Sequence, residues 1–554
     1  MSGENDPILD HVAQKPKRRL WLRVIGWSAT LVALFLLGSF WLLVRVAHRP
    51  SPVHATLTPA EIASEEAYLK GLGLILPDGS LLKEQPFAPP WTSHSLLTPS
   101  SWSRQPGIKM LIGPRHVRAD LLLADLDVLE PVMERAYGGW DSAAARGWNW
   151  NQWFADWRKQ LAAEGSDQIP FDQAFAPFDA LIAFQRDNHT QIPLNRWSTY
   201  DGSQTALLAS APGAPCEEIR AGGNSFPIAP NDPGLHPRGA KLWKSGSKSF
   251  ADTSYISMPS SYGAPQSVRC GGAWIPLHPI ASPGGAGWSP VLRAMWAELH
   301  RDPTRIERFG EGVAYARLPT FSWKNYEQVS RAGWAHRVPE DRVLIVDLRD
   351  NSGGSWGYGL DALKDWFDDS RMIPFGDLGK ELTSSCLYAP LRWNYSIQST
   401  PAILPDQKEF LQDQLHQMAK PYPPGCPRTV AVSSPKWTYL QRRFDPKPGD
   451  LRVLVLVNSR CGSDCEMLTT ELASLPQTIV AGVNTFGVGQ FMQPGYSVLP
   501  RTGLSYRIAL GRSNLYGDNR SFDGYGLDVD IVLPEIDSMK PEQMRELAKI
   551  VARM

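Results

Sequence analysis

Apolar side chains recur along this chain at two different spacings, and each spacing predicts a different kind of element. Between residues 120 and 184 they recur every three to four residues, which indicates amphipathic helices. We expect helices at Leu122–Met133, Trp150–Leu161 and Phe171–Phe184, with Pro131 kinking or splitting the first. The aromatic side chains of this segment are expected in its core.

Beyond residue 312 the pattern changes to short apolar runs, bounded by glycine-containing turns and by helix-length segments. Such runs, rich in β-branched residues, predict the buried strands of an α/β layer. The runs are Gly312–Leu318, Arg342–Asp347, Val453–Val457, Thr478–Ala481 and Ile531–Leu533. Residues 504–510 instead alternate apolar and polar side chains, which predicts a half-buried strand. We therefore expect an α/β core.

The longest apolar run lies near the N-terminus. Residues 24–44 carry no charge, and they are long enough to cross a bilayer at ~20 residues. More basic residues precede this run than follow it, which places the N-terminus in the cytoplasm and the chain after about His48 outside it. We expect a single-pass membrane protein whose main body is periplasmic or otherwise extracytoplasmic.

These patterns divide the chain into nine segments. In chain order we expect a cytoplasmic tail (1–20), a transmembrane signal anchor (21–46), a Pro- and Ser-rich stalk (47–105), a helical subdomain (106–194), a β- and loop-rich module (195–305), the first part of the α/β core (306–372), an insertion (373–448), the second part of the core (449–536) and a C-terminal helix (537–554).

Composition narrows the function. The 56 basic and 56 acidic residues cancel, so nothing indicates a nucleic acid partner. Six cysteines in an exported domain suggest disulfides, and proximity along the chain favours the pairs Cys216–Cys270, Cys386–Cys426 and Cys461–Cys465. No zinc-binding pattern occurs, and we expect neither a metal nor a cofactor.

Two residues stand where chemistry is possible. Ser463 follows a strand and a polar turn and opens a helix, so the unpaired backbone amides of that helix could hold an oxyanion while the serine attacks a carbonyl. An alternative is that Ser463 is simply an N-cap. His189 lies just past the third predicted helix, where a histidine often only caps carbonyl groups.

Four blocks in order resemble the tail-specific (C-terminal processing) and tricorn-core serine proteases. They are Val346–Gly354, similar to D-L-R-x-N-x-G-G; Val457–Glu466, similar to V-N…S-A-S-A-S-E; Thr485–Gly489, similar to T-F-G-K-G; and Gly526–Pro534, similar to G-I-x-P-D-V-x-V-P. The resemblance places Ser463 on the catalytic serine, and it covers roughly residues 310–372 and 450–536.

The departures from this family indicate a particular branch. Val488 stands where tail-specific proteases have their catalytic lysine, and valine cannot take a proton. The tricorn-core branch lacks that lysine too and looks like it uses a histidine in a D-x-H-T block, which Asp187–Thr190 matches through His189. The same branch has an acid just before its fourth block, where Asp523 stands.

The resemblance therefore implies a Ser463–His189–Asp523 triad, with the acid fixing the histidine tautomer. The oxyanion hole is expected from the N–H of Asp464 and one N–H of Gly353 and Gly354.

We expect a membrane-anchored serine endopeptidase that acts on a peptide or protein substrate. Its activity should rise as His189 loses its proton, roughly between pH 6 and 8. The alternative is a catalytically inactive protein that binds a peptide or an apolar ligand on the same scaffold.

Overall fold

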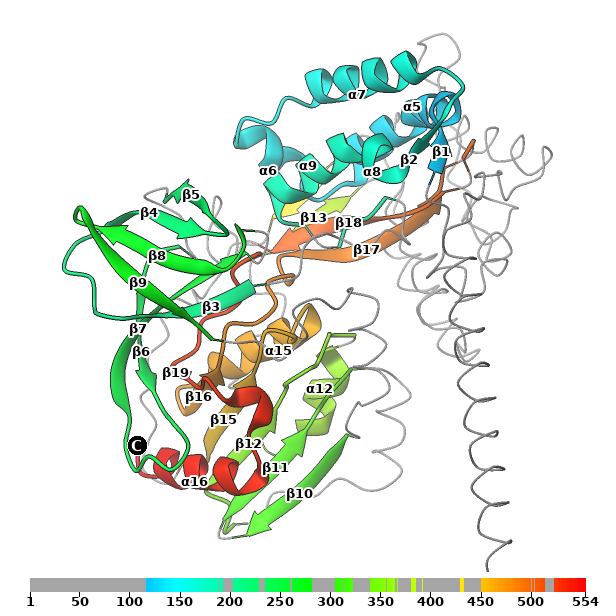
Figure 1. The fold of residues 1–554 in the computed structure, drawn as a ribbon. Coiled ribbons are helices and arrows are strands. Elements are labelled where there is room, and N and C mark those ends of the chain that lie inside the picture. Colours follow the sequence, from blue (N-terminus) through cyan, green and yellow to red (C-terminus); the bar gives the residue numbers. More distant parts are fainter. Residues whose placement is uncertain are drawn as a thin grey trace, which may run out of the picture.

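The computed structural model, shown in Figure 1, describes the part of the chain that carries the predicted core. The described residues are 116–187, 189–192, 203–228, 235–259, 262–280, 304–310, 312–321, 339–354, 356–363, 366, 380–384, 391, 429–432, 450–499, 501–502, 504–513 and 523–554. The predicted tail, anchor, stalk and Cys386–Cys426 pair, and most of the insertion, lie outside them. Within the described residues no helix is both long and apolar enough to cross a membrane.

A parallel sheet forms the core, as the apolar runs predict. Its strands are β11 (Val313–Arg317), β12 (Val343–Asp347), β15 (Arg452–Val457), β16 (Thr478–Gly482) and β19 (Ile531–Val532), in that spatial order, with β10 (Arg305–Gly310) antiparallel at the edge. Helices α12 (Trp356–Leu363) and α15 (Asp464–Ala473) pack on one face, and α16 (Pro541–Val551) packs on the other. Burial on both faces explains why these strands are continuously apolar.

The same sheet continues into a β-rich module. Strand β19 pairs in parallel with β6, and six antiparallel neighbours follow to give a sheet of thirteen strands within the described residues. In spatial order the module is β6 (Arg238–Leu242), β7 (Ala251–Pro259), β3 (Ser203–Leu208), β9 (Ala273–Pro279), β8 (Pro265–Cys270), β4 (Cys216–Ala221) and β5 (Asn224–Pro227). The predicted Cys216–Cys270 disulfide is present between β4 and β8.

The helical subdomain contains more helices than we predicted. Its elements are β1 (His116–Arg118), α5 (Ala119–Ala136), α6 (Trp140–Ala145), α7 (Trp150–Glu164), β2 (Gln168–Pro170), α8 (Phe171–Ala174) and α9 (Ala176–Gln185). Pro131 lies inside α5 without ending it. The prediction of a single helix at Phe171–Phe184 is wrong, because the helix is interrupted at Phe175. A new helix, α9, begins after it with Pro177 in its first turn, where the missing N–H of proline has no helical acceptor to lose.

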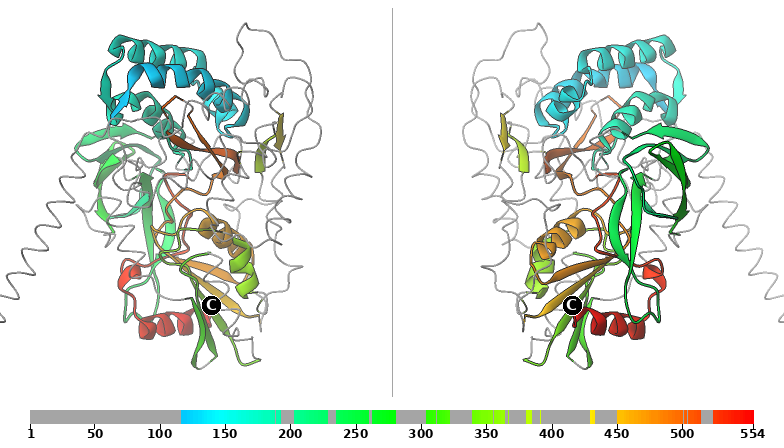
Figure 2. Two further views of the ribbon diagram at one scale, coloured as in Figure 1. Left: turned by 90° about the vertical axis from the view of Figure 1, so that its right-hand side faces the viewer. Right: turned by 90° about the vertical axis from the view of Figure 1, so that its left-hand side faces the viewer.

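A second, antiparallel sheet lies between this subdomain and the core. It contains β14 (Thr429–Val432), β13 (Lys380–Ser384), β18 (Ser505–Ser513) and β17 (Phe491–Val498), in that order. The apolar residues of β18 share one buried cluster with the helices, which confirms the predicted strand. Its expected half-burial is wrong, because Ala509, Arg512 and Ser513 are buried as well. Figure 1 and the two side views of Figure 2 show the helices above, β17 and β18 in the middle, and the parallel sheet with α16 below.

One buried carboxylate holds the helices on the β17–β18 turn. Asp125 of α5 is fully buried and accepts the N–H of Arg501 at 2.7 Å, the N–H of Thr502 at 2.9 Å and the Thr502 hydroxyl at 2.6 Å. Its removal would leave two backbone donors and a hydroxyl buried without an acceptor.

We predict that Asp125→Ala lowers the free energy of unfolding by about 2–4 kcal/mol, because each unsatisfied buried donor costs about 1–3 kcal/mol. Urea denaturation followed by tryptophan fluorescence measures this loss. Asp127→Ala is the matched control, since Asp127 lies on the same helix with 72% of its side chain exposed and pairs only with Arg158. Equal stability of the two variants would contradict the role of Asp125.

Candidate active site

Ser463 occupies a strained turn between β15 and α15. Its φ of 57° and ψ of −125° are unusual for a residue other than glycine, and such conformations cost about 1–3 kcal/mol. Its side chain makes no hydrogen bond that caps the helix. Instead Ser463 Oγ lies 3.1 Å from His189 Nε2, across 274 residues of sequence. Ser463 is thus the N-cap residue of α15, in a capping box with Glu466, and the expected serine–histidine contact exists as well.

His189 is placed beside Ser463 by the chain that follows α9. Burial, together with the positive charge of Arg507, lowers the pKa of His189 to about 3. This direction favours a neutral imidazole between pH 6 and 8, so the rise in activity on its deprotonation is now expected at lower pH. The Nδ1 atom of His189 is buried and has no hydrogen-bond partner.

Asp523 does not take the position that the resemblance implies. Its carboxylate accepts the backbone N–H of Gln490 at 2.8 Å and that of Phe491 at 3.4 Å, and no hydrogen bond joins it to His189. These two amides lie at the entry to β17, and they take up the Asp523 carboxylate. Burial raises the pKa of Asp523 well above its usual range. The hydrogen-bonded unit is thus a Ser463–His189 dyad rather than a triad.

The expected oxyanion donors are only partly available. Gly353 lies against the nucleophile, since a Cβ built on it would come within 2.8 Å of Ser463 Cβ and 3.0 Å of Asp464 N. Its own N–H, however, donates to Asn351 Oδ1 at 2.8 Å, so the assignment of this amide to the oxyanion hole is wrong in this structure. Asp464 is the first residue of α15, where amides have no helical acceptor, and Gly354 is the remaining candidate from the glycine pair.

Glu466 is the important residue that our sequence reasoning missed. It is fully buried, and its two carboxylate oxygens accept the N–H groups of Ser463 (3.2 Å), Gly487 (2.7 Å) and Val488 (2.8 Å), together with the Thr485 hydroxyl. Burial raises its pKa to about 7, and the hydrogen bonds oppose this rise. A glutamate three residues after a helix-capping serine is a known capping signal and could have revealed it.

Two further features fix the turn. The predicted Cys461–Cys465 disulfide is present, with a Cα–Cα distance of 5.5 Å, and brackets Ser463. Val488, at the position of the family's lysine, is 8% exposed, and its Cγ2 atom lies 3.1 Å from where a Cβ on Gly462 would stand. An apolar side chain thus packs against the nucleophile turn at the position where the sequence resemblance led us to look for a lysine.

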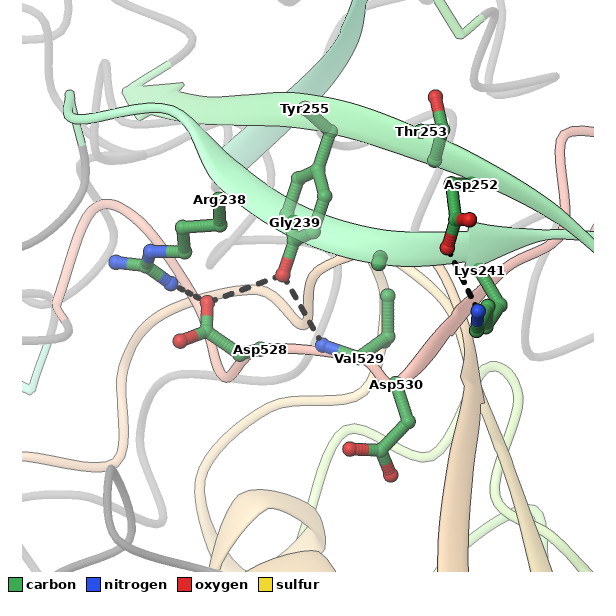
Figure 3. A pocket seen from close by; sticks show the side chains of 10 residues that line it. Arg238, Gly239, Lys241, Asp252, Thr253, Tyr255, Asp528, Val529 and Asp530 are labelled. Carbon is green, nitrogen blue, oxygen red and sulfur yellow. Dashed lines mark hydrogen bonds and ion pairs between the residues drawn. The ribbon is translucent and has the colours of Figure 1, made fainter. Parts of the chain in front are cut away.

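A separate hollow of about 540 Å³ lies between the β6–β7 hairpin and the chain before β19 (Figure 3). Tyr255 contacts both Asp528 and the N–H of Val529 there, and Arg238 pairs with Asp528. Neither Ser463 nor His189 lines this hollow.

Comparisons with known proteins agree with the four sequence blocks. Residues 312–533 match the family model of peptidase family S41. The chain has no significant match among curated proteins. Among solved structures, mature CPAF complexed with lactacystin has 17% identity and a TM-score of 0.38, covering 78% of this chain and 98% of that one.

Two other solved structures are similar at comparable levels. The photosystem II D1 C-terminal processing protease has 14% identity and a TM-score of 0.31, over 78% of this chain and 97% of that one. The tricorn protease has 11% identity and a TM-score of 0.33, over 78% of this chain and 37% of that one.

We predict that Glu466→Ala lowers the free energy of unfolding by about 3 kcal/mol or more, because it leaves four buried donors without an acceptor. Denaturant unfolding measures this, with the exposed Glu542→Ala as control.

The same residue predicts a pH dependence. Folding raises the pKa of Glu466 from 4.5 to about 7, so the folded state holds the extra proton and its stability falls as the pH rises through this window. Glu466→Gln cannot titrate and should lack this slope. The measurement is the free energy of unfolding of both proteins as a function of pH. If the two curves have the same slope, the pKa of Glu466 is not raised.

Proposed function

The chain carries a domain of peptidase family S41, residues 312–533, and on that basis we propose that it hydrolyses peptide bonds with Ser463 as nucleophile and His189 as general base. The substrate is then a peptide or a protein. His189 lies outside the matched segment, so its role does not follow from the family match. The observation that carries it is the 3.1 Å contact between Ser463 Oγ and His189 Nε2.

The protonation state of His189 suits the first step. Because its pKa is about 3, the ring is neutral at physiological pH and Nε2 can accept the Ser463 proton while Oγ attacks the carbonyl carbon. The tetrahedral oxyanion would be held by the N–H of Asp464 and the N–H of Gly354. The oxyanion also stabilises the adjacent imidazolium, which has no acceptor at Nδ1. His189 then returns the proton to the leaving amine.

We also propose that residues 21–46 anchor the peptidase in a membrane and that the catalytic part is extracytoplasmic. The apolar run and its basic N-terminal flank support this topology. The two disulfides at Cys216–Cys270 and Cys461–Cys465 agree with an oxidising compartment.

A binding protein without catalysis is the second candidate. Asp464, the residue after the serine, carries a negative charge that opposes an oxyanion nearby, and among the described residues His189 Nδ1 has no hydrogen-bond partner. A fluorophosphonate probe separates the two functions, since it labels only an activated serine.

We predict that the probe labels wild type at Ser463, and that Ser463→Ala abolishes both labelling and peptidase activity. His189→Ala should lower kcat/KM by about 10²–10⁴-fold, the usual contribution of a general base. The exposed His278→Ala is the matched control and should behave as wild type. Asp523→Asn should lower kcat/KM far less than His189→Ala, because no hydrogen bond joins Asp523 to His189 Nδ1. If Asp523→Asn and His189→Ala lower kcat/KM equally, Asp523 belongs to a catalytic triad and the dyad is contradicted.

The acid limb of the pH profile tests the environment of His189. We predict that the loss of kcat/KM caused by protonation of His189 occurs only below pH 5, because burial and the charge of Arg507 disfavour the protonated ring. Arg507→Gln removes one of the two causes and should move the limb to higher pH. Stopped assays from pH 4 to 9 provide the measurement. An apparent pKa near 6.5 for wild type would mean that the ring is solvated in the working enzyme.

A further inference from the structure

We propose that Asp187 is a positioning residue for the reaction: it holds the backbone that carries His189 and does not act on the imidazole ring. This inference rests on the proposed peptidase function. Asp187 is fully buried. Its Oδ1 atom accepts the N–H of His189 at 2.8 Å and the N–H of Thr190 at 3.1 Å. One carboxylate oxygen thus fixes two successive peptide groups around the base.

The end of α9 explains why these two amides need an acceptor. Arg186 adopts the left-handed conformation, with φ 60° and ψ 29°, and turns the chain out of the helix. The N–H of Asp187 still reaches the Ile182 carbonyl, at 3.3 Å. The amides of His189 and Thr190 lie beyond the end of the helix, so helical carbonyls no longer accept them. The Asp187 side chain supplies the acceptor instead.

The other end of the same segment is fixed to β18. The Thr190 hydroxyl accepts the N–H of Ala509 at 3.0 Å. Gln191 and Arg507 then exchange two backbone hydrogen bonds, of 2.8 and 2.9 Å. His189 therefore sits in a short span held by Asp187 on one side and by the sheet on the other. With both ends fixed, the ring reaches Ser463 Oγ without a hydrogen bond of its own at Nδ1.

The charge of Asp187 is not directed at the ring. In a triad the acid accepts the Nδ1 proton of the histidine. Here Nδ1 has no hydrogen-bond partner, and the pKa of His189 is set by burial and Arg507. Burial raises the pKa of Asp187, whereas the hydrogen bonds that it accepts from Thr190 and His189 lower it. The side chain is therefore used as an acceptor for amides, a task for which an asparagine oxygen suffices.

The test compares Asp187→Asn with Asp187→Ala in the full-length protein. Asparagine keeps the acceptor, so we expect kcat within about tenfold of wild type. Alanine releases the two amides, and we expect kcat to fall about 10²-fold with KM little changed, because a misplacement of about 1 Å costs this much. The exposed Asp156→Ala is the control. The pH profile of the asparagine variant should match wild type.

A second readout does not depend on activity. Nitrogen NMR of the imidazoles reports the hydrogen bond between His189 Nε2 and Ser463 Oγ, and this signal should persist in Asp187→Asn and be lost in Asp187→Ala. Should Asp187→Ala not fold, Thr190→Val, which removes the acceptor for Ala509, should lose the same signal while Thr190→Ser keeps it.

Two outcomes overturn the proposal. Wild-type kcat and an unchanged NMR signal in Asp187→Ala would show that the carboxylate does not hold His189. If kcat falls as much in Asp187→Asn as in Asp187→Ala, and the pH profile of kcat is shifted, the charge of Asp187 acts on the ring. Failure of the peptidase function itself is seen separately, as a wild-type protein that no fluorophosphonate labels although its NMR signal is intact.

Discussion

The site depends on one fully buried carboxylate, that of Glu466. Its oxygens accept donors from Ser463, Thr485, Gly487 and Val488, so a single side chain closes the nucleophile turn against the segment that follows β16. The Thr485 hydroxyl in turn accepts the N–H of Leu527, which attaches the fourth sequence block to the same point. A strained serine persists only where its surroundings over-determine it, and this network is what over-determines Ser463.

A second buried charge network organises the first block. Asp347, at the end of β12, accepts hydrogen bonds from Arg317, Arg349 and Tyr315, and Arg349 continues to the carbonyl of Ile536 at 2.7 Å. Buried charges are tolerated only when they are fully paired. The charged residues of this block therefore connect the end of β12 to the segment that precedes α16. Their role is structural: they support the turn that contains Gly353 and Gly354, and they supply no reacting group.

The sequence predicted those features that depend on periodicity and order. Five apolar runs became the parallel strands, because burial on both faces leaves a continuous signature. The resemblance of the four blocks led to Ser463 and His189, which the structure brings together, and their catalytic roles stay a proposal. Chain proximity identified the Cys461–Cys465 bridge.

The errors share a physical cause. Asp523 and Gly353 were assigned to catalysis, yet a nearby backbone amide or side-chain amide already uses each of them. Glu466 and Asp187 were overlooked, although each accepts amides a few residues along the chain. Apart from the capping spacing of Ser463 and Glu466, hydrogen bonds between a side chain and a backbone group leave no periodic pattern in a sequence. A motif therefore shows which residues are present and not which atoms they bind. The break at Phe175 is similar, since both halves of the segment are equally helical in pattern.

The distance in sequence between the two reacting side chains has a consequence for biosynthesis. His189 emerges from the ribosome long before Ser463, from which 274 residues separate it, and the strand that holds its loop, β18, is made later still. The contact between these two side chains therefore cannot form before Ser463 has been made. Both this contact and the pairing of Gln191 with Arg507 that holds the His189 loop can form only once these late segments of the chain have been made.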